Sequence, residues 1–249
     1  MLGISIRKNI GIGDALQFSS VPENYYRATG NRLIDISEHW FFDHNPYVVR
    51  KTEPEKTIEL WNFGPRQYEF PKLRSQGVYL CNAEIHAGVL GVTSPKLIRP
   101  RLYKFENFPI EKREMILLHT HGRSHGALPD HVIDHVLRKY HKMPLYHIGL
   151  PTDPDLGIPK IETPTLWDLA RVISECRIFI GNDSGPSWIA ACYPDVVAKK
   201  VRMKPGLEEL PKHVPLEVAN IHSHWDDRLF QHYNASEDDI GFLQSYRKL

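Results

Sequence analysis

The sequence predicts an α/β protein built on parallel β-sheet, and its second half carries most of that prediction. Short apolar runs there alternate with segments whose apolar residues recur at helical spacing. The run at 115–119 (MILLH) is almost continuously apolar, as expected of a strand buried on both faces. Repeated strand-then-helix order favours parallel strands joined by right-handed crossovers.

The elements of the second half follow in order. After the strand at 115–119 we expect a helix over 129–140, a strand over 144–148, a helix over 166–175, a strand over 177–180 and a helix over 186–192. The first two helices each carry an apolar stripe, made of Val132, Ile133, Val136, Leu137 and Tyr140 in one and Leu166, Leu169, Ala170 and Ile173 in the other. Ligands of such sheets bind beyond the carboxyl ends of the strands, so the functional site is expected at that edge.

The first half is richer in turns. Its strand-like runs are 2–6, 33–36, 57–60 and 78–80, with a helix expected to begin near Asp14. The polar segment 105–113 contains a proline and is the candidate linker. We therefore assign two domains, 1–108 and 109–249. A last helix is expected from about Ser236, capped by its hydroxyl, and could pack back on the first domain.

Composition excludes several classes of function. The 249 residues contain 31 Lys and Arg against 30 Asp and Glu, so the net charge of +1 gives no strong attraction to nucleic acid or anionic lipid. Three cysteines are too few for a disulfide framework, and the 14 histidines show no tight metal spacing. We expect no metal. The N-terminus does not resemble a signal peptide, and no apolar run approaches the length of a membrane span, so a cytoplasmic protein is expected.

The most informative segment is 178–193, IFIGNDSGPSWIAACY. A buried strand ends, the turn Asn182-Asp183-Ser184-Gly185-Pro186 follows, and proline suits the first position of the next helix. Gly185 allows close approach to the backbone, and the free N–H groups at the helix start favour a diphosphate. The alternative is an ordinary turn in which Asp183 or Ser184 caps the helix.

The segment 9–17, NIGIGDALQ, directly follows the first strand. It lacks the third glycine of a dinucleotide fingerprint because that position is Leu16, which disfavours a nicotinamide cofactor. Its glycines make a tight turn that brings Asp14 to a helix start at the edge of the sheet. A carboxylate there can act as general base toward an acceptor hydroxyl, or it can merely cap the helix.

Two further loops carry polar residues. In the segment 119–129, HTHGRSHGALP, Arg123 can pair with a phosphate, while Thr120, His121 and His125 can donate hydrogen bonds; a solvated surface loop is the alternative. Asp153-Pro154-Asp155 has the D-x-D form seen in metal-dependent glycosyltransferases, but two acids around a proline also make an ordinary turn.

Together these segments resemble glycosyltransferase family 9, the bacterial heptosyltransferases. GIGDAL at 11–16, the Asn45-Pro46 pair, the stretch from Leu118 to Pro129 and NDSGPSWIAAC at 182–192 match motifs of that family in order and spacing. The sequence departs from the family at Trp188, where the family has histidine, and at Gly126, where it usually has lysine. It is identified as a shortened, divergent relative.

The resemblance implies a GT-B fold, in which two Rossmann-like parallel-sheet domains face a cleft, and an inverting transfer without a catalytic metal or other cofactor. It makes Asp14 the general base. It assigns donor binding to Gly13, Thr120, His121, Arg123, His125, Asp183, Ser184, Gly185 and Trp188, the last by stacking in place of the family histidine.

The implied partners are a nucleotide-sugar donor and an acceptor, with the oligomeric state left open. The acceptor could be a glycan, such as a lipopolysaccharide core sugar, or a modified DNA base. A DNA acceptor needs a basic groove with stacking aromatics, to which Arg99, Arg101, Tyr103 and Lys104 could contribute. The alternatives are a nucleotide-sugar epimerase or hydrolase of the same fold, and a nucleotide-binding scaffold protein without catalysis.

Overall fold

The computed structural model describes residues 1–7, 10–50, 52–60, 82–93, 97, 99–105, 110–122, 126–182, 184–201 and 231–232. These residues form two compact units, and each is described by itself. The first unit holds 1–110 and 191–193; the second holds 111–190 and the described residues that follow 193. The expected strand at 78–80 and the expected helix from Ser236 lie outside the described residues, and the domain assignment 1–108 and 109–249 stays a prediction.

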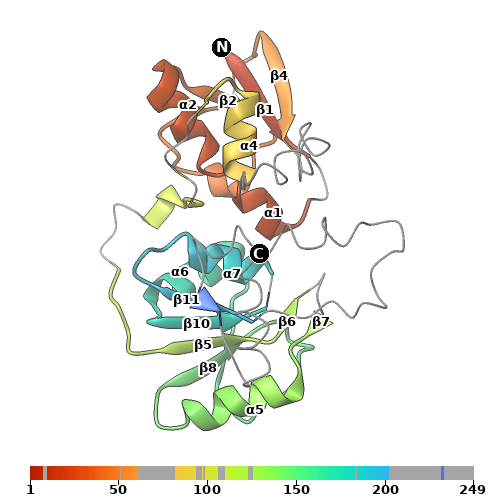
Figure 1. The fold of residues 1–249 in the computed structure, drawn as a ribbon, viewed down its shortest axis with the longest axis vertical. Coiled ribbons are helices and arrows are strands. Elements are labelled where there is room, and N and C mark those ends of the chain that lie inside the picture. The colour runs from red at the N-terminus through yellow and green to blue at the C-terminus, as the bar shows by residue number, and fades with distance from the viewer. Residues whose placement is uncertain are drawn as a thin grey trace, which may run out of the picture. The chain divides into compact units, whose positions relative to one another are not determined.

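The first unit contains a four-stranded sheet in which every pair of neighbours is parallel (Figure 1). Its strands, in the order β3-β2-β1-β4, are β1 (Leu2–Ile6), β2 (Leu33–Asp35), β3 (Val48–Val49) and β4 (Lys56–Leu60). Its helices are α1 (Ile12–Leu16), α2 (Val21–Thr29) and α4 (Asn82–Val89), with 3-10 turns η1 (Trp40–Phe42) and η3 (Tyr103–Phe105).

Local chemistry explains how the first unit is built. In β1 the apolar side chains of Ile4 and Ile6 are buried, and Ile4 lies opposite Ile58 of β4. The helix expected near Asp14 begins at Ile12 and is only five residues long. The longer helix α2 carries proline in its first turn and ends at Gly30, whose φ of 73° suits a residue without a Cβ.

The second unit contains a six-stranded sheet in the order β12-β11-β10-β5-β8-β9, again parallel throughout. Its strands are β5 (Ile116–His119), β8 (Leu145–Ile148), β9 (Lys160–Ile161), β10 (Ile178–Gly181), β11 (Val197–Lys200) and β12 (Gln231–His232). A small antiparallel hairpin, β6 (His121–Gly122) with β7 (Gly126–Ala127), follows β5 directly. The predicted parallel α/β class is confirmed.

Three helices accompany this sheet, α5 (Asp130–Lys139), α6 (Leu166–Glu175) and α7 (Gly185–Ala191). Helix α5 lies on one side of the strands, and α6 and α7 lie on the other (Figure 1). All four residues of β5 are buried, as its apolar run predicts. The α5 side of the core combines Val132, Val136 and Tyr140 with Ile116 and Leu118 of β5.

Helix α6 has the bounds expected from sequence, and its start is fixed by a capping box. The Thr165 hydroxyl accepts the backbone N–H of Asp168, and the Asp168 carboxylate accepts the backbone N–H of Thr165. Among the described residues, no helix combines the length and the apolar character that crossing a bilayer requires.

Candidate active site

The carboxyl ends of β5 and β10 meet at one edge of the second sheet. The two strands are parallel neighbours, and His119, the last residue of β5, lies opposite Gly181, the last residue of β10. The segments that leave these strands therefore start side by side, although more than 60 residues separate them in sequence. They gather a strand-end cluster, defined here as His119, Thr120, His121, His147, Asn182 and Ser184.

Ser184 joins the two sides of the strand-end cluster. Its hydroxyl lies 3.3 Å from Nδ1 of His119 and donates to the backbone oxygen of Asn182 at 3.4 Å. Helix α7 begins at the next residue, Gly185, followed by Pro186. The hydroxyl thus stands at the amino end of a helix, where backbone N–H groups have no helical partner.

Asn182 ties the hairpin β6–β7 to the end of β10. Its side chain is fully buried, and Nδ2 donates to the backbone oxygen of Gly126 at 2.9 Å. Gly122 of the same hairpin packs so closely on the amide that an added Cβ would lie 2.7 Å from Nδ2. The backbone oxygen of Asn182 also accepts the hydroxyl of Ser187 in α7. One asparagine therefore positions both the loop after β5 and the start of α7.

Thr120 connects two histidines. Its hydroxyl lies 2.9 Å from Nδ1 of His121 and 3.1 Å from Nε2 of His147, the third residue of β8. Thr120 is fully buried, and its backbone oxygen accepts the N–H of Leu128 at 2.7 Å. The hydroxyl is consequently held at a fixed place between the two imidazoles.

Burial keeps the inner histidines uncharged. It lowers the pKa of His119 from 6.5 to about 4, against the opposing effect of the Asp153 carboxylate. Burial also lowers the pKa of His147, with a further contribution from the charge of Lys160. At neutral pH these rings act as hydrogen-bonding groups and not as cations. Within the described part of the chain, no three His, Cys, Asp or Glu side chains are arranged to hold a metal ion.

The two acids of the D-x-D pattern bind their own loop. Asp153 accepts the backbone N–H of Leu150 at 2.8 Å, and Asp155 accepts that of Gly157 at 2.9 Å. Both contacts are typical of turns in which a short acidic side chain replaces a backbone partner. The geometry therefore favours the turn interpretation of this motif.

Asp14 lies in the first turn of α1, in the first unit. The helix cap is Gly11 and has no side-chain hydrogen bond, so Asp14 is the third helical residue and not the cap. Its carboxylate lies over Gly11, where an added Cβ would come 3.2 Å from Oδ2. Gly13 is buried in the same turn. The carboxylate thus stands beyond the carboxyl end of β1, as the sequence predicts.

A second polar group, which sequence reasoning did not predict, lies in the first unit at the carboxyl end of β2. The buried carboxylate of Asp35 accepts the backbone N–H and hydroxyl of Ser37 and the backbone N–H of His39. Arg50 donates to Asp35 at 3.4 Å, to Asp43 at 2.7 Å and to the backbone oxygen of His39. Because β1 and β2 are parallel neighbours, this group lies at the same sheet edge as the turn before Asp14.

The structure brings together four of the sequence-predicted site residues, Thr120, His121, Ser184 and Gly185, at one sheet edge. Trp188 lies within α7 and is 7 % exposed, so a ligand could reach only an edge of its indole. Arg123, His125 and Asp183 lie outside the described residues. Sequence reasoning assigned no role to the side chains of His119 and His147, and it named Asn182 only as part of the turn before α7; their position at the ends of expected strands was the available signal.

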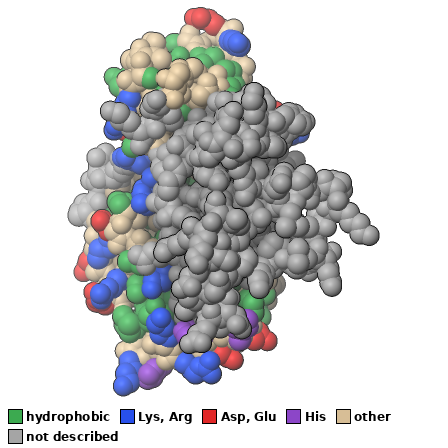
Figure 2. Space-filling view, in the orientation of Figure 1, with side chains coloured by type: hydrophobic (Ala, Val, Ile, Leu, Met, Phe, Trp, Pro, Cys, Tyr) green, Lys and Arg blue, Asp and Glu red, His purple; other side chains and the backbone are tan. Residues whose placement is uncertain are grey.

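The proposed nucleic-acid groove is not supported at Tyr103. This side chain is 5 % exposed, and its hydroxyl donates to the buried carboxylate of Glu23 at 2.6 Å, so its ring is not free to stack on a base. The guanidinium of Arg101 lies 5.3 Å from the centre of the same ring. On the face drawn in Figure 2, basic side chains lie interspersed with acidic ones, in keeping with the near-neutral net charge.

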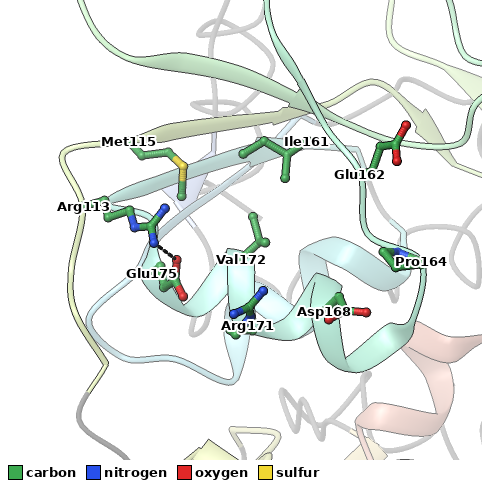
Figure 3. Close-up of a pocket in the computed structure, with 9 residues that line it drawn as sticks. All are labelled: Arg113, Met115, Ile161, Glu162, Pro164, Asp168, Arg171, Val172 and Glu175. Carbon is green, nitrogen blue, oxygen red and sulfur yellow. Dashed lines mark ion pairs between the residues drawn. The ribbon is translucent and has the colours of Figure 1, made fainter.

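A pocket of about 390 Å³ lies elsewhere in the second unit, along α6 (Figure 3). Three of the charged residues that line it have partners nearby. Arg113 pairs with Glu175 at 3.2 Å, and Asp168 belongs to the capping box of α6. None of the residues of the strand-end cluster lines it. Its position and its chemistry separate it from the candidate active site.

No protein-family model matches the sequence, and no curated protein matches it either. Several solved structures share its fold. The iron-containing dodecameric glycosyltransferase TibC of enterotoxigenic E. coli H10407 has a TM-score of 0.58 at 18% identity, over 80% of this chain and 57% of that one. Another structure of TibC contains ADP-D-beta-D-heptose. E. coli heptosyltransferase WaaC with ADP has a TM-score of 0.60 at 12% identity, over 92% of this chain and 97% of that one.

A glycosyltransferase family 9 protein from Veillonella parvula DSM 2008 has a TM-score of 0.57 at 13% identity, over 80% of this chain and 79% of that one. At such identities the likeness concerns the fold, and the chain spans little more than half of TibC. The chain has a heptosyltransferase-like α/β fold of the GT-B type. The resemblance read from its motifs is thereby confirmed for the fold.

Proposed function

We propose that this chain is a glycosyltransferase that transfers a sugar from a nucleoside-diphosphate sugar to an acceptor hydroxyl. The observation that carries the proposal is the strand-end cluster, in which the Ser184 hydroxyl and the His119 imidazole lie 3.3 Å apart beside the start of α7. Parallel α/β sheets bind ligands at this edge. The fold shared with the heptosyltransferases supports the same reaction class.

In the proposed donor site the diphosphate lies at the start of α7. The N–H groups around Gly185 and the hydroxyl of Ser184 donate to its oxygens, and His121, which is hydrogen-bonded to the buried Thr120, approaches from the adjacent strand end. The helix dipole adds roughly 0.3–1 kcal/mol at an exposed site, so these polar side chains are needed as well. Arg123, His125, Asp183 and Trp188 remain proposed donor contacts.

In the proposed reaction Asp14 takes the proton of the acceptor hydroxyl. The acceptor oxygen forms a bond to the anomeric carbon as the bond from that carbon to the diphosphate oxygen breaks, so the configuration is inverted. The nucleoside diphosphate leaves with the bonding pair, and N–H and hydroxyl donors stabilise its charge without a metal ion. The partners we propose are a nucleotide-sugar as donor and a glycan as acceptor.

A thermal-shift screen against ADP, UDP, GDP, CDP and TDP and their common sugars tests donor binding. A ligand held at 100 times its dissociation constant adds about 2.7 kcal/mol of stability. We expect one nucleoside diphosphate to raise the melting temperature and Ser184→Ala to weaken that response. Ser174→Ala, at a buried hydroxyl in α6 that bonds only its own helix, is the matched control. No shift with any donor, in protein shown to be folded, contradicts the proposal.

Product analysis separates the alternatives. A transferase consumes the donor only when an acceptor is supplied, whereas an epimerase or hydrolase consumes the donor alone. A protein that binds the donor and never turns it over is a scaffold. ADP-heptose is the first donor to test, because TibC has been seen with it.

A further inference from the structure

The hydroxyl of Thr120 stands between two imidazoles and has only one proton to donate. It lies 2.9 Å from Nδ1 of His121 and 3.1 Å from Nε2 of His147, and both distances suit hydrogen bonds. If both contacts are hydrogen bonds and both rings are neutral, the hydroxyl donates to one nitrogen and accepts an N–H from the other. The tautomers of the two histidines are therefore coupled.

Two arrangements satisfy this requirement. In the first, His147 donates its Nε2–H to Thr120 and Thr120 donates to Nδ1 of His121, which leaves the proton of His121 on Nε2. In the second, His121 donates its Nδ1–H to Thr120 and Thr120 donates to Nε2 of His147, which leaves Nε2 of His121 without a proton. Only the first gives His121 an N–H on the side of the ring away from Thr120.

The carboxylate of Asp153 favours the first arrangement. Its Oδ2 and the Nε2 of His147 both border the space beside Gly149, at 2.1 and 3.5 Å from the position that a Cβ would take there. A negative charge near Nε2 stabilises a proton on that nitrogen. The loop is held in place because Asp153 accepts the N–H of Leu150 and Lys160 donates to the Leu150 backbone oxygen.

Lys160 and His121 lower the pKa of His147, Lys160 more strongly than Asp153 raises it, and Asp155 raises it as well. These charges act on the protonation of the whole ring, whereas the position of Asp153 beside Nε2 is what distinguishes its two nitrogens. Burial lowers the pKa of His147, which keeps the ring neutral with a single N–H. His121 itself is only half-buried, so the residue is partly accessible to a ligand.

We propose that Thr120 is a positioning residue that, with His147 and Asp153, holds His121 as its Nε2–H tautomer, so that His121 presents an N–H to an anionic ligand. The ligand named here is the diphosphate of the nucleotide-sugar, and that identification rests on the proposed function. The tautomers predicted for His121 and His147 in the ligand-free protein do not depend on the proposed function.

Imidazole ¹⁵N spectra of the full chain without ligand test the tautomers directly. We expect Nε2–H for both His121 and His147 in the wild type, and a mixture at His121 in Thr120→Val, which keeps the shape of the side chain and removes the hydroxyl. Thr120→Ser should retain the wild-type pattern. A wild-type His121 protonated at Nδ1 alone, or an unchanged His121 in folded Thr120→Val, overturns the proposal.

Asp153→Asn is a second variant in case Thr120→Val does not fold. Asparagine keeps an oxygen for the Leu150 N–H and removes the charge, so the His147 proton should move in part to Nδ1. An unchanged His147 tautomer contradicts the role of Asp153.

Titration with ADP and with inorganic pyrophosphate then separates this proposal from the proposed function. We expect Thr120→Val to weaken ADP binding roughly three- to tenfold, the loss of about one hydrogen bond, and Thr120→Ser to bind like the wild type. Equal binding by wild type and Thr120→Val overturns the positioning role and leaves the proposed function intact. The expected tautomers without any nucleotide or pyrophosphate binding support the positioning and contradict the proposed function.

Discussion

Gly122 and Asn182 are packed so tightly that position 122 has no room for the Cβ that any other residue would bring. A Cβ there would lie 2.7 Å from Nδ2 and 3.1 Å from Oδ1 of Asn182. The same Nδ2 donates to the backbone oxygen of Gly126. The contact joins the hairpin after β5 to the end of β10, and both segments contribute residues to the strand-end cluster.

Gly122→Ala should therefore lower the stability of the second unit by about 1–3 kcal/mol, because it overpacks a buried amide and disturbs its hydrogen bond. Urea unfolding and amide exchange of β5 and β10 would measure the loss. Adding Asn182→Ala to the same chain removes the clash, so the two losses should be less than additive. Strict additivity would mean that the two residues do not interact.

Asp14→Asn should abolish transfer while leaving the fold unchanged. A general base contributes typically about 10²–10⁴-fold to the rate, and asparagine cannot accept the proton. The measurement is kcat with the donor found by the thermal-shift screen, with Asp134→Asn on the exposed side of α5 as the matched control. Activity of Asp14→Asn within a few-fold of the wild type would remove Asp14 as the base.

Acidification should destabilise the second unit through His119. Its pKa is about 4 in the folded chain and 6.5 as the reference value. Between these two pH values the unfolded chain binds more protons than the folded chain. The free energy of unfolding that depends on neutral His119 is therefore fully present above about pH 6.5 and is lost as the pH falls toward 4. At roughly 1.4 kcal/mol for each pKa unit, the loss has a ceiling of about 3 kcal/mol.

Urea unfolding between pH 7.5 and 4.5 would show this loss. The pKa of His147 is lowered as well and contributes in the same direction, and the lowered pKa of His39 has the corresponding effect on the first unit. His119→Asn replaces Nδ1 with an amide that does not titrate in this range, so its stability should depend less steeply on pH. An identical slope in the variant would show that His119 does not carry the effect.

Glu23→Ala should destabilise the first unit by about 3 kcal/mol, because it leaves the partners of a buried carboxylate unsatisfied. Glu23 is 2 % exposed and binds Arg27 at 2.6 Å and the Tyr103 hydroxyl at 2.6 Å. Thermal unfolding and amide exchange in α2 are the measurements. Glu59→Ala, at an exposed position of β4, is the control, and an equal effect of both substitutions would refute the prediction.

Thr165→Ala should cost about 1 kcal/mol, since it removes one half of the capping box at the start of α6. Thr152→Ala, at an exposed loop position, should be neutral in the same thermal unfolding experiment. The response to nucleoside diphosphates should survive in Thr165→Ala, because the strand-end cluster lies elsewhere in the unit. A lost nucleotide response would connect α6 and the pocket of Figure 3 to donor binding.

Sequence alone determined the elements whose signal is local. The apolar run before Thr120, the helical stripe of α5 and the span 166–175 of α6 are set by residues close in the chain, and each was predicted where it lies. The start of α7 was also predictable from sequence, because proline fixes the backbone for the first turn of a helix and glycine allows conformations that other residues avoid. Strands of two residues, such as β3 and β9, are too short to show a repeating apolar pattern, and they form only by pairing with a neighbouring strand.

The candidate site depended on contacts between distant residues. The sequence placed Thr120, His121, Ser184 and Gly185 at strand ends but did not indicate which strands are neighbours. The pairing of β5 with β10 and β8 puts His119 beside Ser184 and His147 beside Thr120. Burial then lowers the pKa values of His119 and His147 and makes them hydrogen-bonding groups. Desolvation depends on everything that surrounds a side chain, so only the tertiary structure could decide it.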